Sequence, residues 1–479
     1  MRKTTSKVFR DYFKANYPGL DNDPTYWRLL RYLLFGIRTK EGDLLIDGWH
    51  LSKAEEKTHL YRYNNYCGID FLNRFKSDVL TDLMWSNWDY KEGKARVAYP
   101  NFPIEVLELL DKEPTNMKEC RVYFDTGLKF SRKRQKIDLE IMREEALTYF
   151  EFARPESQGL LEYMNNLPTN SFSKIIEANF ESTWIAASKL QDPLSKRVQV
   201  EILLTIKDEL RPLYKPSIKG NTVRIFPFNA SIPMLRRDLR KKLCKGWYEF
   251  DLANSQLAII GKTWNVTEVQ DYLLANRKIW VELFTHFGID AATLKVQDSD
   301  KYEGIKKVFK DNLYSTIYGM SPSNVIKDVT TRLEVWGIYS GGNEFVNFPL
   351  VKTLFTAREE RMDYLSSVGK SQTIFGKELV VTGGFNKKGK PDLDRRASLR
   401  SILAEEAQAI ELYIMLPVLD LAKSTNNFLI TLWQHDGFSV NFTDKTKKDI
   451  WLKRIVNSIN QRASELGIVT QLESALLEG

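Results

Sequence analysis

The pattern of apolar and polar residues along this chain separates expected helices from expected strands. Residues 26–34 and 140–152 place apolar side chains at helical spacing, and Asp23-Pro24 is a typical helix start. Residues 247–253 (WYEFDLA) and 428–442 (FLITLWQHDGFSVNF) instead hold short runs rich in aromatic and β-branched side chains, which favour strands. The pattern therefore predicts an α+β protein.

An acidic residue ends the first of these expected strands. Asp251 follows Trp247–Phe250, and the apolar run Leu257–Ile260 that begins shortly after it indicates a buried helix. A carboxylate at a strand-to-helix junction is well placed to face a cleft. An Asp or Asn that only caps the helix is the simpler interpretation of this segment by itself.

A second acid lies at the centre of residues 428–442. The runs FLITLWQ and FSVNF flank His435-Asp436-Gly437, and this pattern predicts a β-hairpin with an acid at its tip. An ordinary solvent-facing Asp-Gly turn would explain the same pattern. His435 is, however, one of only four histidines in the chain.

A third segment, residues 301–320, predicts a helix with cations and phenols on one face. Lys306, Lys310, Tyr314 and Tyr318 recur every four residues, and this spacing drifts by about 40° per step around a helix. Cations can hold phosphates, and aromatic rings can stack on bases. A surface helix whose lysine stems cover apolar residues is the alternative.

Composition narrows the class of protein. The 479 residues are 43% hydrophobic and 28% charged, which excludes a mainly disordered, collagen-like or coiled-coil chain and suggests about three domains. There is no apolar stretch long enough to span a membrane and no secretory signal, so we expect a cytoplasmic protein of a bacterium or of a virus-infected host. Three cysteines form neither a disulfide framework nor a zinc site.

Positive charge is concentrated locally. The chain has 70 Lys and Arg against 62 Asp and Glu, a net charge of +8 that is weak evidence over this length. Residues 129–136, 236–245 and 386–400 are strongly basic. Each run alone is typical of a solvated surface, whereas three such runs fit a groove that follows phosphates.

Taken together and in this order, the three segments resemble the polymerase motifs A, B and C of the family A DNA polymerases and the related single-subunit RNA polymerases of phages and mitochondria. Asp251 resembles the motif A aspartate, and His435-Asp436 resembles motif C. The segment Lys306–Gly319 resembles the motif B helix, with Lys306 where the family usually has Arg. The resemblance covers about residues 220–479.

The resemblance implies a right-hand polymerase fold, with an antiparallel palm sheet, helical fingers and a helical thumb. The expected divisions are a helical N-terminal region of unknown role (1–120), thumb and connecting helices (121–245), palm with motif A (246–269), fingers (270–380) and palm with motif C (381–479).

The resemblance also implies a two-metal transfer of nucleotides to a 3′-hydroxyl, with two Mg²⁺ ions or Mn²⁺ in their place. Asp251, Asp436 and the backbone carbonyl of Leu252 would hold the metal ions. Lys310 would contact the incoming triphosphate and protonate the leaving pyrophosphate. Lys306 would add positive charge at the phosphates.

Further residues are expected to contact the nucleotide and the nucleic acid. Tyr314 would lie beside the sugar and base of the nucleotide, and Tyr318 near the templating base. Gly319 would let the template strand approach closely. Arg224 and His435 would contact the nucleic acid. The expected partners are a DNA template, a primer or nascent strand and (d)NTPs, and we expect a monomer.

The nature of the product stays open. The short separations between the motifs and the ending Tyr318–Ser321 look like the DNA polymerases, whereas Ser255 four residues after Asp251, and the reading His-Asp-Gly-Phe of motif C, look like the RNA polymerases. The size of the region before Asp251 favours a DNA-directed DNA polymerase without proofreading, of a virus or mobile element. The glutamate with which the DNA enzymes crowd a 2′-hydroxyl lacks a clear counterpart. Gln256 or Ala258 stands nearby, which predicts weak rejection of ribonucleotides.

Three alternatives remain. The chain could be a DNA-directed RNA polymerase or primase of the phage type. It could be a replication protein that binds nucleic acid without catalysis. It could also be a basic helical binding protein in which the three motifs occur by chance.

Overall fold

The computed structural model describes residues 4–35, 44–46, 69–85, 96–99, 101–119, 121–217, 220–228, 230–339, 341–386 and 389–478. Parts of the expected N-terminal region 1–120, and Cys67 and Cys120, lie outside these residues. Cys244 is buried. The described chain is mostly helical with small antiparallel sheets.

The N-terminal elements form a unit with its own core. They are β1 (Thr4–Ser6), α1 (Lys7–Asn16), η1 (Pro18–Asp21), α2 (Pro24–Phe35), β2 (Leu44–Ile46), α4 (Ile69–Asp78), β3 (Met84–Trp85), β4 (Arg96–Tyr99), α5 (Ile104–Glu119) and β5 (Arg121–Tyr123). β1 pairs with β5, and Phe124 packs against Trp27 with ring centroids 5.5 Å apart. This core therefore includes residues that follow position 120.

A mainly helical segment, which also contains two short strands, connects this unit to the central sheet. It comprises α6 (Arg132–Thr148), η3 (Tyr149–Phe152), α7 (Pro155–Asn165), α8 (Asn170–Ser188), α9 (Pro193–Asp208), β6 (Tyr214–Pro216), β7 (Ile225–Pro227), η4 (Ile232–Met234) and α10 (Arg237–Leu243). Phe172 of α8 packs edge-on against the fully buried Trp247, so these helices share a core with the sheet. The helix expected over 140–152 ends at residue 148 and continues as a 3₁₀ turn.

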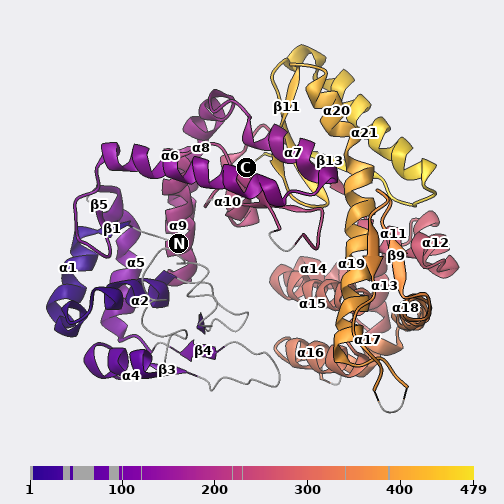
Figure 1. Ribbon diagram of the computed structural model, residues 1–479, viewed down its shortest axis with the longest axis horizontal. Coiled ribbons are helices and arrows are strands. Elements are labelled where there is room, and N and C mark those ends of the chain that lie inside the picture. Colours follow the sequence, from indigo (N-terminus) through magenta and orange to yellow (C-terminus); the bar gives the residue numbers. More distant parts are fainter. Residues whose placement is uncertain are drawn as a thin grey trace.

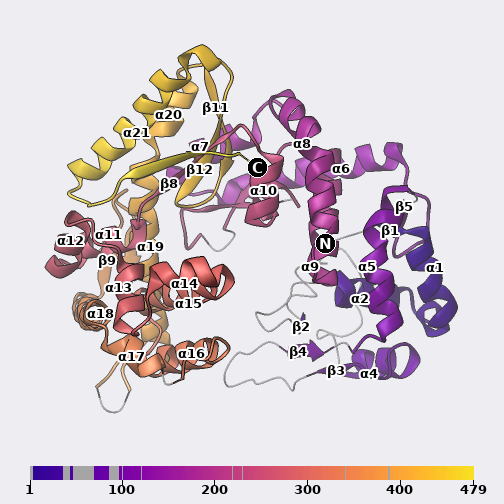
Figure 2. The ribbon, with the colours of Figure 1, turned by 180° about the vertical axis from the view of Figure 1, so that it is seen from behind.

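The central sheet has four strands in the order β11-β12-β8-β13, and all its pairs are antiparallel. The strands are β8 (Tyr248–Leu252), β11 (Phe428–Trp433), β12 (Gly437–Phe442) and β13 (Leu472–Leu476). Phe250 and Phe438 stack across β8 and β12 with centroids 4.9 Å apart. Helices α20 (Pro417–Lys423) and α21 (Lys448–Glu465), with η5 (Lys445–Lys447) before α21, lie along the sheet, where Trp451 packs on Phe428 (Figure 2). The expected antiparallel sheet and hairpin are thus present.

A second helical unit follows β8 and has a separate core. It comprises α11 (Ser255–Thr263), α12 (Thr267–Leu274), α13 (Ile279–His286), α14 (Ala291–Gln297), α15 (Ser299–Ile317), α16 (Pro322–Glu334), α17 (Gly341–Asn347), α18 (Pro349–Val368), β9 (Lys370–Gln372) and β10 (Glu378–Val380). The long helix α19 (Leu393–Met415) then returns the chain to the sheet.

The two helical units lie on opposite sides of the molecule. Figures 1 and 2 show α1–α5 on one side and α13–α18 on the other, joined by α6–α10 and the central sheet. The right-hand polymerase arrangement stays a prediction. Among the described helices, none has the length and apolar character needed to cross a bilayer.

Candidate active site

The structure brings Asp251 and Asp436 together at one end of β8 and β12. Asp251 is the register partner of Gly437, and the Leu252 N–H donates to the Asp436 carbonyl at 3.1 Å. Partners on antiparallel strands have Cα atoms about 5 Å apart, and consecutive Cα atoms are about 3.8 Å apart. The Cα atoms of the two acids are therefore within about 9 Å of each other.

The hairpin tip has a conformation that its residues make possible. His435 adopts a left-handed φ of 64°, and the Gln434 N–H donates to the Gly437 carbonyl at 2.8 Å. A Cβ atom at Gly437 would lie 2.5 Å from the Phe250 carbonyl oxygen and 3.4 Å from Asp251 Oδ1. Only glycine lets β12 approach β8 this closely, and this contact places Asp436 next to Asp251.

The surroundings of this place shift the pKa values of Asp251 and Tyr314. Partial withdrawal from water, and then the charge of Asp436, raise the pKa of Asp251 to about 6, while Lys310 opposes the rise. Burial, and then the charges of Asp436 and Asp251, raise the pKa of Tyr314 to about 12. An acid whose pKa is raised by a second acid, beside a lysine, is typical of functional sites.

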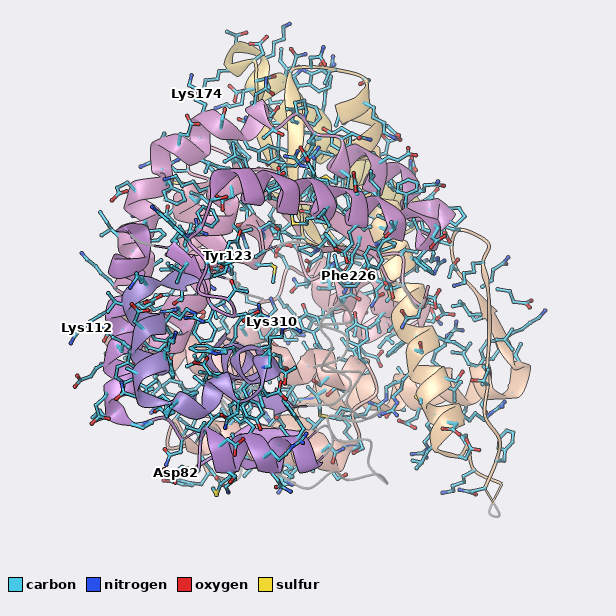
Figure 3. The ribbon with its side chains drawn as sticks, turned by 60° about the vertical axis from the view of Figure 1, so that its left-hand side comes forward. Asp82, Lys112, Tyr123, Lys174, Phe226 and Lys310 are labelled. Carbon is cyan, nitrogen blue, oxygen red and sulfur yellow. The ribbon has the colours of Figure 1, made fainter. Side chains whose placement is uncertain are left out.

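Helix α15 supplies the lysine and the tyrosine. Asp298 caps its first turn by accepting from the Lys301 N–H at 2.9 Å. The Lys310 Nζ lies 5.9 Å from the centroid of the Tyr314 ring, and Figure 3 shows where Lys310 lies in the molecule. Lys306 lies one turn earlier, where its Nζ is 3.9 Å from Glu303. The structure therefore places Lys310 at the acids and gives Lys306 a partner on its own helix.

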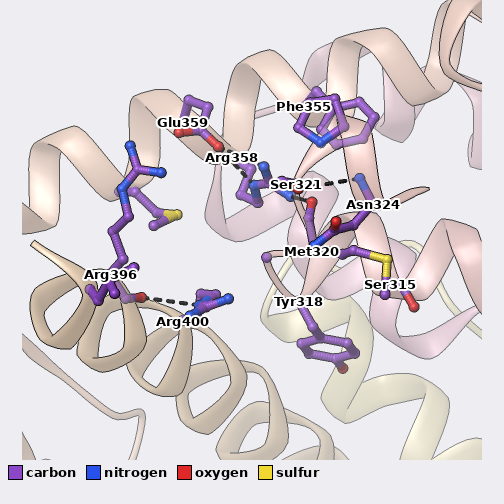
Figure 4. A pocket seen from close by; sticks show the side chains of 14 residues that line it. Ser315, Tyr318, Met320, Ser321, Asn324, Phe355, Arg358, Glu359, Arg396 and Arg400 are labelled. Atoms are coloured by element: carbon purple, nitrogen blue, oxygen red, sulfur yellow. Dashed lines mark hydrogen bonds and ion pairs between the residues drawn. The ribbon is translucent and has the colours of Figure 1, made fainter. Parts of the chain in front are cut away.

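Two arginines lie at the end of α15. Gly319 has a φ of 97°, and a side chain there would overlap Arg400. Arg358 is buried and donates to the carbonyls of Thr316 at 2.6 Å and Met320 at 2.8 Å, so it provides a side-chain donor for acceptors at the end of this helix. A cavity of about 660 Å³ adjoins this turn (Figure 4). Its lining includes Tyr318, Gly319, Met320, Phe355, Arg396 and Arg400.

Arg224 lies at the same site, and its partner is a buried acid. It precedes β7 and donates to Glu411 Oε1 at 2.7 Å. Glu411 also accepts from the Gln256 amide, and the Gln256 carbonyl oxygen accepts from the Tyr318 hydroxyl. Burial, opposed by Arg224, raises the pKa of Glu411 to about 7. Four segments distant in sequence thus meet through side-chain hydrogen bonds.

His435 packs on the neighbouring strand β7. Its ring meets that of Phe226 edge-on at 5.4 Å between centroids, and its Nδ1 has no hydrogen-bond partner among the described residues. Burial, and then the charge of Arg224, lower the pKa of His435 to about 4. His435 is therefore neutral at pH 7.

Two residues of this site were not predicted individually from the sequence. Glu411 is a single charge in the apolar run 407–415, and this pattern is the signal that could have marked it as a buried, paired acid. Arg358 lies on a helix with charges on several faces, and its sequence context gives no comparable signal.

Asp251 and Asp436 are the two carboxylates that the pairing of β8 with the hairpin brings side by side. No group of three or more His, Cys, Asp or Glu side chains suited to a metal ion occurs within the part of the chain that the structure describes. Mg²⁺ in nucleotide sites uses one or two carboxylates together with waters and phosphate oxygens. Asp251 and Asp436 fit that donor set, and the Leu252 backbone lies beside them.

No family model and no curated protein sequence matches the chain. A similar solved structure is the POL domain of Pol1 from M. smegmatis, in complex with a DNA primer-template and dNTP. The match is 11% identical with a TM-score of 0.44, and it covers 70% of this chain and 65% of that chain. We therefore derive the proposed function from the geometry of the site.

Proposed function

We propose that this chain is a template-directed nucleotidyltransferase that adds nucleotides to a 3′-hydroxyl. The observation that supports it best is the convergence of Asp251 and Asp436 from neighbouring strands with Lys310 and Tyr314 from a separate helix. The acids and the helix are far apart in sequence. If Asp251 only capped a helix and Asp436 only formed a turn, nothing would require these residues to lie together.

Two divalent ions, Mg²⁺ or Mn²⁺, are part of this proposal. When bound, such ions activate the attacking hydroxyl and neutralise charge on the phosphates. Asp251 and Asp436 would hold them, with the Leu252 carbonyl as a further oxygen donor. The solvent exposure of Asp251 leaves room for waters and phosphate oxygens.

The other side chains would bind and orient the substrates. Lys310 would pair with the triphosphate and donate a proton to the leaving pyrophosphate. Tyr314, whose raised pKa keeps its phenol protonated, would lie against the sugar and base. Tyr318 would face the templating base, and the adjoining cavity, with Arg396 and Arg400, would accept the template strand.

We propose DNA as the product, made without proofreading. The deciding experiment is primer extension and primer-independent synthesis on single-stranded and duplex templates, with dNTPs and NTPs, in Mg²⁺ or Mn²⁺. Extension by the wild type that Asp251→Ala abolishes, with template binding retained, supports the proposal. Template binding without synthesis under every condition contradicts it and favours a non-catalytic binding protein.

A further inference from the structure

A network of side-chain hydrogen bonds, centred on a buried acid, joins four segments of the chain. Glu411 of α19 is 1% exposed and is the shared acceptor for Arg224, before β7, and Gln256, on α11. Gln256 is also buried, and its other end receives the hydroxyl of Tyr318, the residue that follows α15. The result is a continuous path Arg224–Glu411–Gln256–Tyr318.

The acid sets the direction of the path. A glutamine amide has a donor end and an acceptor end, and only the donor end can face a carboxylate. In its ionised form, paired with Arg224, Glu411 therefore turns the Gln256 oxygen toward Tyr318, whose hydroxyl donates to it. Without the carboxylate, the amide could adopt either orientation, and the Tyr318 hydroxyl would lose a fixed acceptor. Arg224 compensates the buried negative charge, which would otherwise be costly.

The turn that carries Tyr318 is also held from the other side. Arg358 of α18 donates to the carbonyls of Thr316 and Met320, on either side of Tyr318. The side chain of Tyr318 lines the cavity at the end of α15 (Figure 4). Gln256 thus holds the hydroxyl of Tyr318, and Arg358 holds the backbone of the turn that carries this residue.

We propose that Glu411 is a positioning residue that fixes the Tyr318 ring through Gln256, so that a correctly paired nucleotide is selected against a rigid surface. This inference rests on the proposed nucleotidyltransferase function. Because Glu411 is 1% exposed, its effect on the nucleotide and the template would pass through Tyr318. Removing it should therefore change which nucleotide is accepted more than how fast the correct one reacts.

The same helix offers a matched control. Glu405 lies on α19, is 6% exposed and is also ion-paired, with Arg154 and, at 2.9 Å, with Lys377. Replacing Glu405 removes a buried acid with two cationic partners outside the path to Tyr318. Glu405→Ala reports the general cost of such a change in this helix.

The first test is a double-mutant cycle on nucleotide selection. We would measure kcat/KM for matched and mismatched nucleotides in the wild type, Glu411→Ala, Tyr318→Phe and the double variant. Each single change should lower the matched-to-mismatched ratio about ten-fold, and the double variant should stay near ten-fold. A loss of about 100-fold in the double variant, or an equal loss in Glu405→Ala, overturns the proposal.

The second test does not depend on activity. The same four proteins, and Glu405→Ala with its Tyr318→Phe double variant, would be compared by thermal unfolding. The shifts for Glu411→Ala and Tyr318→Phe should combine to less than their sum, whereas those of the Glu405 pair should add. Additive shifts in both pairs overturn the link. The thermal shifts could be coupled while the wild type extends no primer. That result would leave the link between Glu411 and Tyr318 intact, but it would overturn the proposed function and the role of Glu411 in selection.

Discussion

Gly437 on β12 is the register partner of Asp251 on β8, and the approach of its Cα to the Phe250 carbonyl leaves no space for a side chain. This contact places Asp436, one residue earlier, beside Asp251. The position of the second acid therefore depends on a glycine that carries no chemistry itself.

That dependence can be measured. Gly437→Ala should push β12 away from β8, costing about 1–3 kcal/mol of the free energy of unfolding and most of the activity, because a Cβ would meet backbone 2.5 Å away. Gly159→Ala is the control, since a Cβ there meets only the end of the Lys423 side chain, at 3.3 Å. Chemical denaturation and primer extension measure both effects. Full activity in Gly437→Ala would show that the close approach is unnecessary.

Activity should fall in acid because Asp251 must be ionised to hold a cation. Its pKa is raised to about 6, so the proton binds as the pH drops through 6 and the carboxylate is progressively lost. At subsaturating Mg²⁺, kcat/KM should fall about ten-fold per pH unit below 6 and level off above 7. A rate profile that is flat from pH 5 to 8 contradicts this role.

The two lysines of α15 should differ in importance. Lys310 acts on Asp251 electrostatically, whereas Lys306 pairs with Glu303. Lys310→Ala should reduce kcat about 100-fold, the scale of lost acid catalysis and phosphate binding, and Lys306→Ala by less than about ten-fold. Single-turnover incorporation at saturating nucleotide separates them. Equal losses would mean that Lys310 contributes only general charge.

Ribonucleotides should be rejected only weakly. The amide of Gln256 is occupied by Glu411 and Tyr318, and Asp251 has no glutamate close behind it on α11. We expect the ratio of kcat/KM for dNTP over NTP, opposite one template base, to lie within about 100-fold. A ratio above about 10⁴ would require a sugar-excluding group elsewhere in the site.

The sequence predicted the local elements that carry the site. The runs rich in aromatic and β-branched residues predicted β8 and the hairpin β11–β12, and the four-residue spacing placed Lys310 and Tyr314 on one helix. Each of these signals lies within a short stretch of sequence, so it can be recognised without knowledge of the tertiary fold.

Contacts between segments distant in the chain were harder to predict from the sequence. Nothing in the local sequence tells that Glu411 meets Gln256 and Arg224, because buried polar partners are chosen by packing between distant elements. The pairing of β1 with β5, which extends the N-terminal unit past residue 120, is likewise a contact between chain segments more than 100 residues apart. The division of the chain into N-terminal region, thumb, palm and fingers, and the roles expected for these parts, stay predictions.

The most direct measurement is single-turnover nucleotide incorporation by Asp251→Asn, Asp436→Asn and the double variant, with Glu249→Gln on the same strand as control. If the two acids hold the same ions, each single change should abolish nearly all incorporation, and the double variant should be no worse than either one. Primer-template binding should persist in all four, and Glu249→Gln should stay active. Substantial incorporation by either single variant, in Mg²⁺ or Mn²⁺, would contradict the account.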